Sequence, residues 1–140
     1  MKKILYGEFL QGRYAIGVLV LRVVVGAAFI YHGWGKIQQP FGWMGADSSI
    51  PGIFQGLAAL SEFGGGIALI LGLLAPLAAL GLACTMVVAI GVVHLPQGHT
   101  FVSGRGGSYE LAAVYLAIMI LLVAAGPGTL SLDYRLFGKK

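Results

Sequence analysis

Four apolar stretches, each close to the length of a membrane-spanning helix, make up most of this chain of 140 residues. They cover residues 14–33, 53–74, 76–94 and 109–125. A helix needs about 20 mostly apolar residues to cross the hydrocarbon core of a bilayer. With 58% hydrophobic and only 10% charged residues, the sequence holds more apolar surface than a soluble domain of this size buries. We therefore predict an all-α fold, an antiparallel four-helix transmembrane bundle that forms one domain over residues 1–140.

The distribution of basic residues predicts which side of the membrane holds the chain ends. Most lysines and arginines lie near the two ends, at Lys2, Lys3, Arg13, Arg135, Lys139 and Lys140. Cytoplasmic segments of membrane proteins carry an excess of such residues, so we expect both termini in the cytoplasm. The net charge of +4 then reflects topology, and no nucleic-acid partner is expected. The short link at residues 74–76 predicts a tight hairpin on the same side, with the longer links at 34–52 and 95–108 facing outward.

Two charged residues lie within the predicted spans, Arg22 in the first and Glu62 in the second. A charge at mid-helix costs about 2.5–3.5 kcal/mol on insertion scales, so such residues are functional candidates. At 1.5 Å per residue, Arg22 is roughly 16 Å and Glu62 roughly 14 Å below the expected outer ends of their helices. Because these depths match, we predict an Arg22–Glu62 ion pair. The pair either contributes to a binding site or is a structural clasp that fixes the register of the two helices.

A second polar set is expected near the outer surface: His32, Lys36, His94, His99, Arg105 and Glu110. Helical spacing places Arg22 and Lys36 on one face of the first helix, leading from the buried arginine to the outer mouth. Glu110 has an alternative role, because an acidic residue in the first turn favours the positive end of a helix dipole. His94 and His99 flank Pro96 with no carboxylate close by in sequence, so we expect no metal site. Hydrogen bonding or proton relay fits the histidines better.

These polar residues sit in a recognisable set of motifs. They are LRVVVG at 21–26, HGWGK at 32–36, SEFGGG at 61–66, YEL at 109–111 and GPGTLSLD at 126–133. Together the motifs resemble the DoxX family of small four-helix membrane proteins, over almost the whole chain. The resemblance implies a bacterial inner-membrane protein related to the membrane subunit of thiosulfate:quinone oxidoreductase.

Three functions stay open at this point. The resemblance favours a membrane subunit or partner of an oxidoreductase system, non-catalytic or quinone-interacting, with a redox protein or quinone as partner. The chain shows no motif for haem, flavin or an iron–sulfur cluster, so no cofactor is expected in the chain itself and a quinone is the candidate ligand. The alternatives are a small-molecule carrier, since buried charges often mark substrate paths, and a structural or stress-response protein without chemistry of its own. A homo-oligomer is compatible with each.

Overall fold

A computed structural model of the chain describes residues 6 and 8–138, and the regular secondary structure of these residues is helical. The elements are α2 (Gly12–Gln38), α3 (Gly52–Leu71), α4 (Ala75–Val88), the π-helical turn η1 (Ala89–His94), α5 (Glu110–Ala125) and η2 (Tyr134–Gly138). The one β-bridge among the described residues joins Thr100 to Ser108. The predicted all-α class is therefore confirmed.

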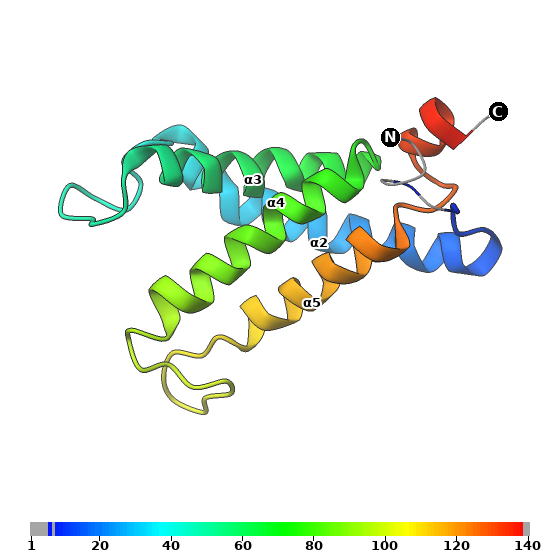
Figure 1. Cartoon of the computed structure of the whole chain (residues 1–140). Coiled ribbons are helices and arrows are strands. Elements are labelled where there is room, and N and C mark those ends of the chain that lie inside the picture. Colours follow the sequence, from blue (N-terminus) through cyan, green and yellow to red (C-terminus); the bar gives the residue numbers. More distant parts are fainter. Residues whose placement is uncertain (1–5, 7, 139–140) are drawn as a thin grey trace.

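The four main helices form two hairpins that diverge from a common end. In Figure 1, α3 lies along α2, and α5 lies along α4. The pairs converge where the turn between α3 and α4 meets the chain segment after α5, which we call the closed end. They separate toward the two long loops at residues 39–51 and 95–109, which we call the open end. The aromatic rings of Tyr6 and Phe137 stack 5.2 Å apart, so the first and last described segments meet at the closed end.

The helix boundaries agree with the predicted ones to within three residues, except at the open end of α2. This helix was predicted to stop near Gly33, but it continues to Gln38. Gly33 packs so tightly on α3 that an added Cβ would lie 2.5 Å from the backbone nitrogen of Phe63, so this glycine is a helix contact and not a helix end. The helix stops just before Gln39, whose helical conformation is disfavoured by the following Pro40.

The closed end is built around the predicted hairpin between α3 and α4. Gly72 takes the left-handed conformation (φ 65°) that ends α3, and the Leu73 N–H donates to the Ala68 carbonyl. The Asp133 carboxylate accepts hydrogen bonds from the N–H groups of Leu74 (2.7 Å) and Ala75 (2.8 Å). The first turn of α4 is thus capped by a side chain that comes from the other end of the chain.

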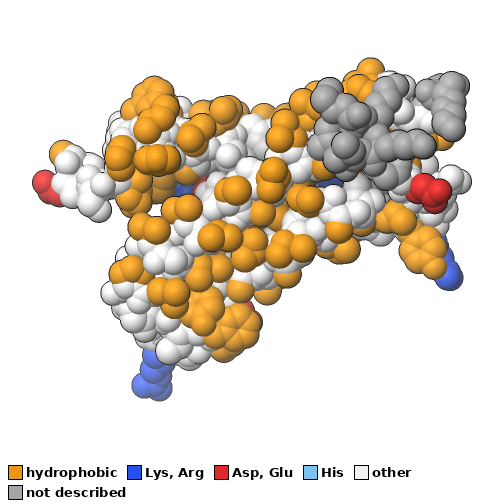
Figure 2. Space-filling view, in the orientation of Figure 1, with side chains coloured by type: hydrophobic (Ala, Val, Ile, Leu, Met, Phe, Trp, Pro, Cys, Tyr) orange, Lys and Arg blue, Asp and Glu red, His pale blue; other side chains and the backbone are white. Residues whose placement is uncertain are grey.

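The surface matches a chain that lies in lipid. Figure 2 shows apolar side chains over most of the visible face between the ends, with the prominent charged side chains projecting at the ends. Three helical segments are long and apolar enough to cross a membrane: α2, α3 and the continuous helix Ala75–His94. The helix α5 has 16 residues, about 24 Å, which is shorter than the roughly 30 Å of a hydrocarbon core.

Candidate ligand-binding site

Arg22 is fully buried, but it does not pair with Glu62 as predicted. Its guanidinium group donates to the carbonyl oxygens of Pro127 (2.5 Å) and Leu130 (2.9 Å), in the segment that follows α5. The predicted ion pair is therefore wrong. Arg22 instead fastens the end of the chain to the closed end of α2, and it belongs to the framework of the protein.

The error came from the depth of the two residues. Because α2 reaches Gln38, Arg22 lies 16 residues, or about 24 Å, from the open end of its helix. Glu62 lies ten residues, or about 15 Å, from the start of α3 at Gly52. An added Cβ at Gly72 would meet the Arg22 guanidinium, so Arg22 is level with Gly72, ten residues beyond Glu62. The two charges are separated by nearly three helical turns.

Glu62 pairs instead with Lys36, one of the residues expected near the outer surface. The Lys36 Nζ lies 2.6 Å from Glu62 Oε1. The glutamate side chain is only 4% exposed and the lysine side chain 26%. Lys36 Nζ also lies 4.5 Å from the centre of the Trp43 ring, a cation–π contact. The ammonium group is thus held between a carboxylate and an aromatic face.

The second oxygen of this carboxylate, Glu62 Oε2, is buried and has no hydrogen-bond partner. A buried carboxylate oxygen without a donor is unfavourable, because it has lost its hydration without replacement. Such an atom is a strong indication of a missing donor. Since Glu62 also lines a cavity, the donor can belong to a ligand.

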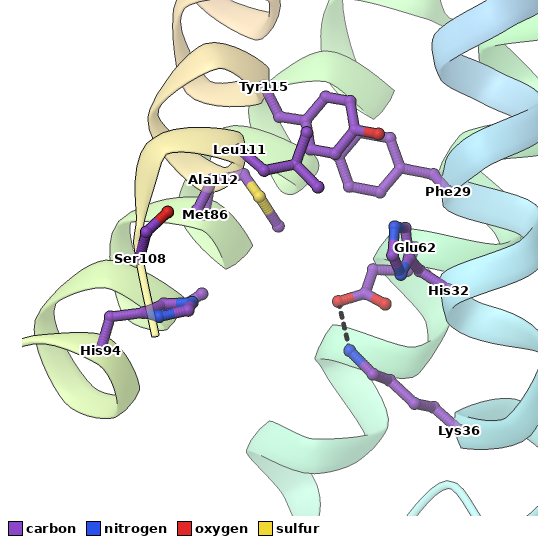
Figure 3. Close-up of a pocket in the computed structure, with 11 residues that line it drawn as sticks. Phe29, His32, Lys36, Glu62, Met86, His94, Ser108, Leu111, Ala112 and Tyr115 are labelled. Atoms are coloured by element: carbon purple, nitrogen blue, oxygen red, sulfur yellow. Dashed lines mark hydrogen bonds and ion pairs between the residues drawn. The ribbon is translucent and has the colours of Figure 1, made fainter. Parts of the chain in front are cut away.

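The cavity beside Glu62 has a volume of about 260 Å³ and lies between the two hairpins. Figure 3 shows Lys36 and Glu62 on one side of it and His94 and Ser108 on the other. The Phe29 and Tyr115 rings, 4.8 Å apart, form its aromatic wall. We call this space the aromatic cavity. Its remaining lining residues are His32, Met86, Ala89, Leu111 and Ala112.

A second cavity of about 290 Å³, which we call the tryptophan cavity, adjoins the first. Both are lined by Lys36, Glu62, Ala89 and His94, so the ion pair lies in the wall between them. Trp43 and Gln55 line only the tryptophan cavity. Gln55 holds the loop after α2 in place, because its side chain accepts from the Met44 N–H (3.0 Å) and donates to the Ile50 carbonyl (2.9 Å).

The structure brings together only part of the predicted outer cluster. His32, Lys36 and His94 line the aromatic cavity. His99 lies directly behind His94, with their Nδ1 atoms 2.8 Å apart, so one ring donates to the other. Arg105 and Glu110 are exposed and line neither cavity. Glu110 occupies the first turn of α5, which fits the alternative role at the helix dipole.

The DoxX family model matches residues 17–95, more than half of the chain. The chain belongs to the DoxX family. It is similar to the inner membrane protein YqjF of Escherichia coli (strain K12), with 34% identity over 131 residues that cover 89% of this chain and 95% of that protein. It is also similar to an uncharacterized protein of Haemophilus influenzae (strain ATCC 51907 / DSM 11121 / KW20 / Rd), with 33% identity over 121 residues that cover 85% and 90%. No solved structure matches the chain.

The family assignment and the apolar helices together identify an integral, multi-pass membrane protein. In this DoxX protein the motifs at 32–36 and 61–66 supply Lys36 and Glu62, whereas the motif at 126–133 supplies the carbonyl groups that hold Arg22. The motifs therefore divide between a polar site and a structural clasp.

Three residues that matter in this arrangement were not among the predicted site residues: Gln55, Tyr115 and Asp133. Each is a polar group in or beside an apolar stretch, which was the available signal. Gln55 and Asp133 are buried and fully used in hydrogen bonds to backbone groups. Tyr115 approaches His32 as well as Phe29, with its ring 6.4 Å from the imidazole.

Proposed function

We propose that this DoxX protein binds a quinone-type ring in the aromatic cavity and serves as a membrane subunit or partner of an oxidoreductase system. The observation that carries the proposal is the buried Glu62 carboxylate, paired with Lys36 through one oxygen and without a donor at the other. This group lies at the polar end of a cavity with aromatic walls. Ligand pockets combine a mainly apolar lining with a few polar groups in the same way.

A quinone ring suits this cavity because it is flat, largely apolar and polar at two opposite positions. Lys36 and a histidine can donate hydrogen bonds to a quinone oxygen. In the reduced form, the ring hydroxyl can donate to Glu62 Oε2 and provide the partner that this atom lacks. The Phe29 and Tyr115 rings offer stacking or edge contacts. Electrons would reach the ring from a redox protein bound at the membrane surface.

We further propose that the protein lies in a bacterial inner membrane, with all four helices across it and both termini in the cytoplasm. The similar Escherichia coli protein is named an inner membrane protein, which supports the location. The first and last described segments meet at the closed end, and basic residues favour the cytoplasmic side. Both cavities then face the outer half of the membrane. Reporter fusions at the C-terminus and in the loop at residues 95–109 test this orientation by showing opposite sides.

Ring binding can be tested by tryptophan fluorescence, because the two tryptophans have different surroundings. Trp43 lines the tryptophan cavity, whereas Trp34 is 58% exposed and packs on Phe63. We would titrate purified Trp34→Phe and Trp43→Phe variants in detergent with the tailless ring, a benzoquinone that carries the ubiquinone ring substituents and a methyl group in place of the tail. The methyl group leaves no ring position open to addition of the exposed Cys84 thiol. We expect saturable quenching of Trp43 and only linear quenching, from partitioning into the micelle, for Trp34.

A matched double variant, Lys36→Met with Glu62→Leu, removes the polar end of the cavity without leaving one charge buried alone. Made in the Trp34→Phe background, it should bind the ring at least tenfold more weakly. Equal, linear quenching in the Trp34→Phe and Trp43→Phe variants, with Lys36 and Glu62 unchanged, would exclude a quinone site here.

A small-molecule carrier is the second candidate, favoured by the presence of cavities on both sides of the Lys36–Glu62 pair. Proteoliposomes that accumulate or release the tailless ring in a Glu62-dependent manner would favour the carrier. Binding without transport would favour the oxidoreductase partner.

A further inference from the structure

A groove on the surface between α3 and α4 leads toward the Lys36–Glu62 pair. It has a volume of about 640 Å³ and adjoins the tryptophan cavity, with which it shares five lining residues: Ile50, Phe54, Ala58, Thr85 and Val88. The tryptophan cavity in turn adjoins the aromatic cavity at Lys36 and Glu62. Three hollows therefore follow one another from the flank of the helices to the buried carboxylate.

The groove exists because α3 and α4 separate toward the open end. They are in close contact near Gly65, where an added Cβ would lie 3.3 Å from the Leu82 side chain. From there the helices diverge, and the space between them is lined by small side chains, including Ser61, Gly81 and Cys84. On α3 the groove extends from Ser61 to Pro51, ten residues or about 15 Å, which is half the thickness of a hydrocarbon core.

The rim of the groove is apolar and faces outward from the bundle. Leu57 on α3 and Val92 on η1 line it, and both side chains are exposed. In a membrane protein such a rim lies against lipid, because no other part of the described chain covers it. The groove is therefore open to the bilayer, and its inner wall, formed in part by Phe54 and Val88, is shared with the tryptophan cavity.

We propose that this groove is a lateral entrance that holds the apolar tail of a lipid-anchored ligand whose ring reaches the Lys36–Glu62 pair. The inference rests on the proposed function and specifies its ligand as a quinone with a long hydrocarbon tail. A tail in lipid gains nothing from leaving it, since lipid chains are as apolar as the protein surface. Passage through an aqueous mouth would expose the tail to water, which is strongly unfavourable. A lateral path keeps the tail in hydrocarbon while the ring moves inward.

Cys84 gives direct access to the groove, because it is exposed and is the only cysteine of the chain. We would compare two probes, the tailless benzoquinone ring and the same ring with a decyl tail. In the first measurement, saturating decyl-tailed probe should slow labelling of Cys84 by a membrane-soluble maleimide at least fivefold, whereas the tailless ring should not.

In the second measurement, a bulky side chain fills the groove. Cys84→Trp should weaken binding of the decyl-tailed probe at least fivefold and leave binding of the tailless ring within twofold. Leu80→Trp is the matched control, because Leu80 is an exposed residue of α4, one turn away, that does not line the groove. It should leave both affinities unchanged.

The outcomes separate the two proposals. If the tailless ring fails to bind the unmodified protein, the proposed function is wrong. If the ring binds but the tail neither protects Cys84 nor responds to Cys84→Trp, the site stands and the lateral entrance is overturned.

Discussion

Gly26 of α2 and Gly66 of α3 face each other so closely that a Cβ added to either would lie 2.6–2.7 Å from the carbonyl oxygen of the other. Helices in lipid associate through close packing of small residues, and this is one of the closest contacts between α2 and α3. We expect Gly66→Val to lower the free energy of unfolding by about 1–3 kcal/mol or more, because neither backbone can yield to the added carbons.

Thermal unfolding in mild detergent measures the effect of the Gly66 substitution. Gly17→Val is the control, since Gly17 lies in α2 with nothing within 4 Å of an added Cβ. Equal midpoints for the two variants would show that the glycine contact does not hold the hairpin together.

The Lys36–Glu62 pair should be more sensitive to the loss of one partner than to the loss of both. Lys36→Met leaves a carboxylate buried without a partner and should destabilise the protein by about 1–3 kcal/mol, less than a fully buried pair because Lys36 is partly exposed. The double variant Lys36→Met with Glu62→Leu should recover much of this loss. Unfolding midpoints of the three proteins test the ranking, and an additive double variant would contradict it.

Asp133 should contribute more to stability than any other acidic residue near the closed end, because its two oxygens cap the first turn of α4. Replacing it with Asn keeps the size but turns one acceptor into a donor that faces an N–H group. We expect a loss of about 2 kcal/mol. Asp47→Asn, in the exposed loop after α2, serves as the control and should change the unfolding midpoint little.

Tyr6 should make the protein less stable at high pH. Burial and the neighbouring Asp133 carboxylate raise the pKa of Tyr6 to about 12, whereas a tyrosine in the unfolded chain titrates near pH 10. The folded state therefore holds the phenol proton more tightly. The resulting stability is complete below about pH 10 and is lost as the pH rises through about 12.

The measurement for Tyr6 is the unfolding midpoint between pH 8 and 12. The unmodified protein should lose stability more steeply than Tyr6→Phe, which cannot ionise at this position. Tyr14→Phe removes an exposed tyrosine and should follow the unmodified protein. Parallel curves for the unmodified protein and Tyr6→Phe would contradict the assignment.

The sequence was sufficient to predict the helices because their apolar stretches are long and the short link at residues 74–76 is marked by Pro76. It was not sufficient at the open end of α2. In a soluble protein, Gly33 and Gly35 would favour a helix end, but here Gly33 is the point at which α3 approaches. In membrane helices, glycine is enriched where neighbouring helices pack closely.

The site could be predicted only as a set of residue types. The charges that matter, Lys36 and Glu62, were both singled out, but they were assigned to different groups. Pairing depends on which residues of α2 lie level with which residues of α3. An error of five residues in the expected end of α2 changes the depth assigned to its side chains by about 7 Å. The carbonyl partners of Arg22 could not be anticipated, because backbone acceptors in a loop leave no signature in residue type.

The attachment of Arg22 to Pro127 and Leu130 also determines the order in which this protein can mature. Arg22 is synthesised more than a hundred residues before the carbonyl groups that accept its hydrogen bonds. The turn that begins α4 likewise lacks its carboxylate until Asp133 has been made. Both the arginine and the central turn therefore stay without these partners until residues 127–133 have been made, and this one short segment supplies them. A protein truncated after α5 would retain α2, α3, α4 and α5 and still lack the segment that ties them together.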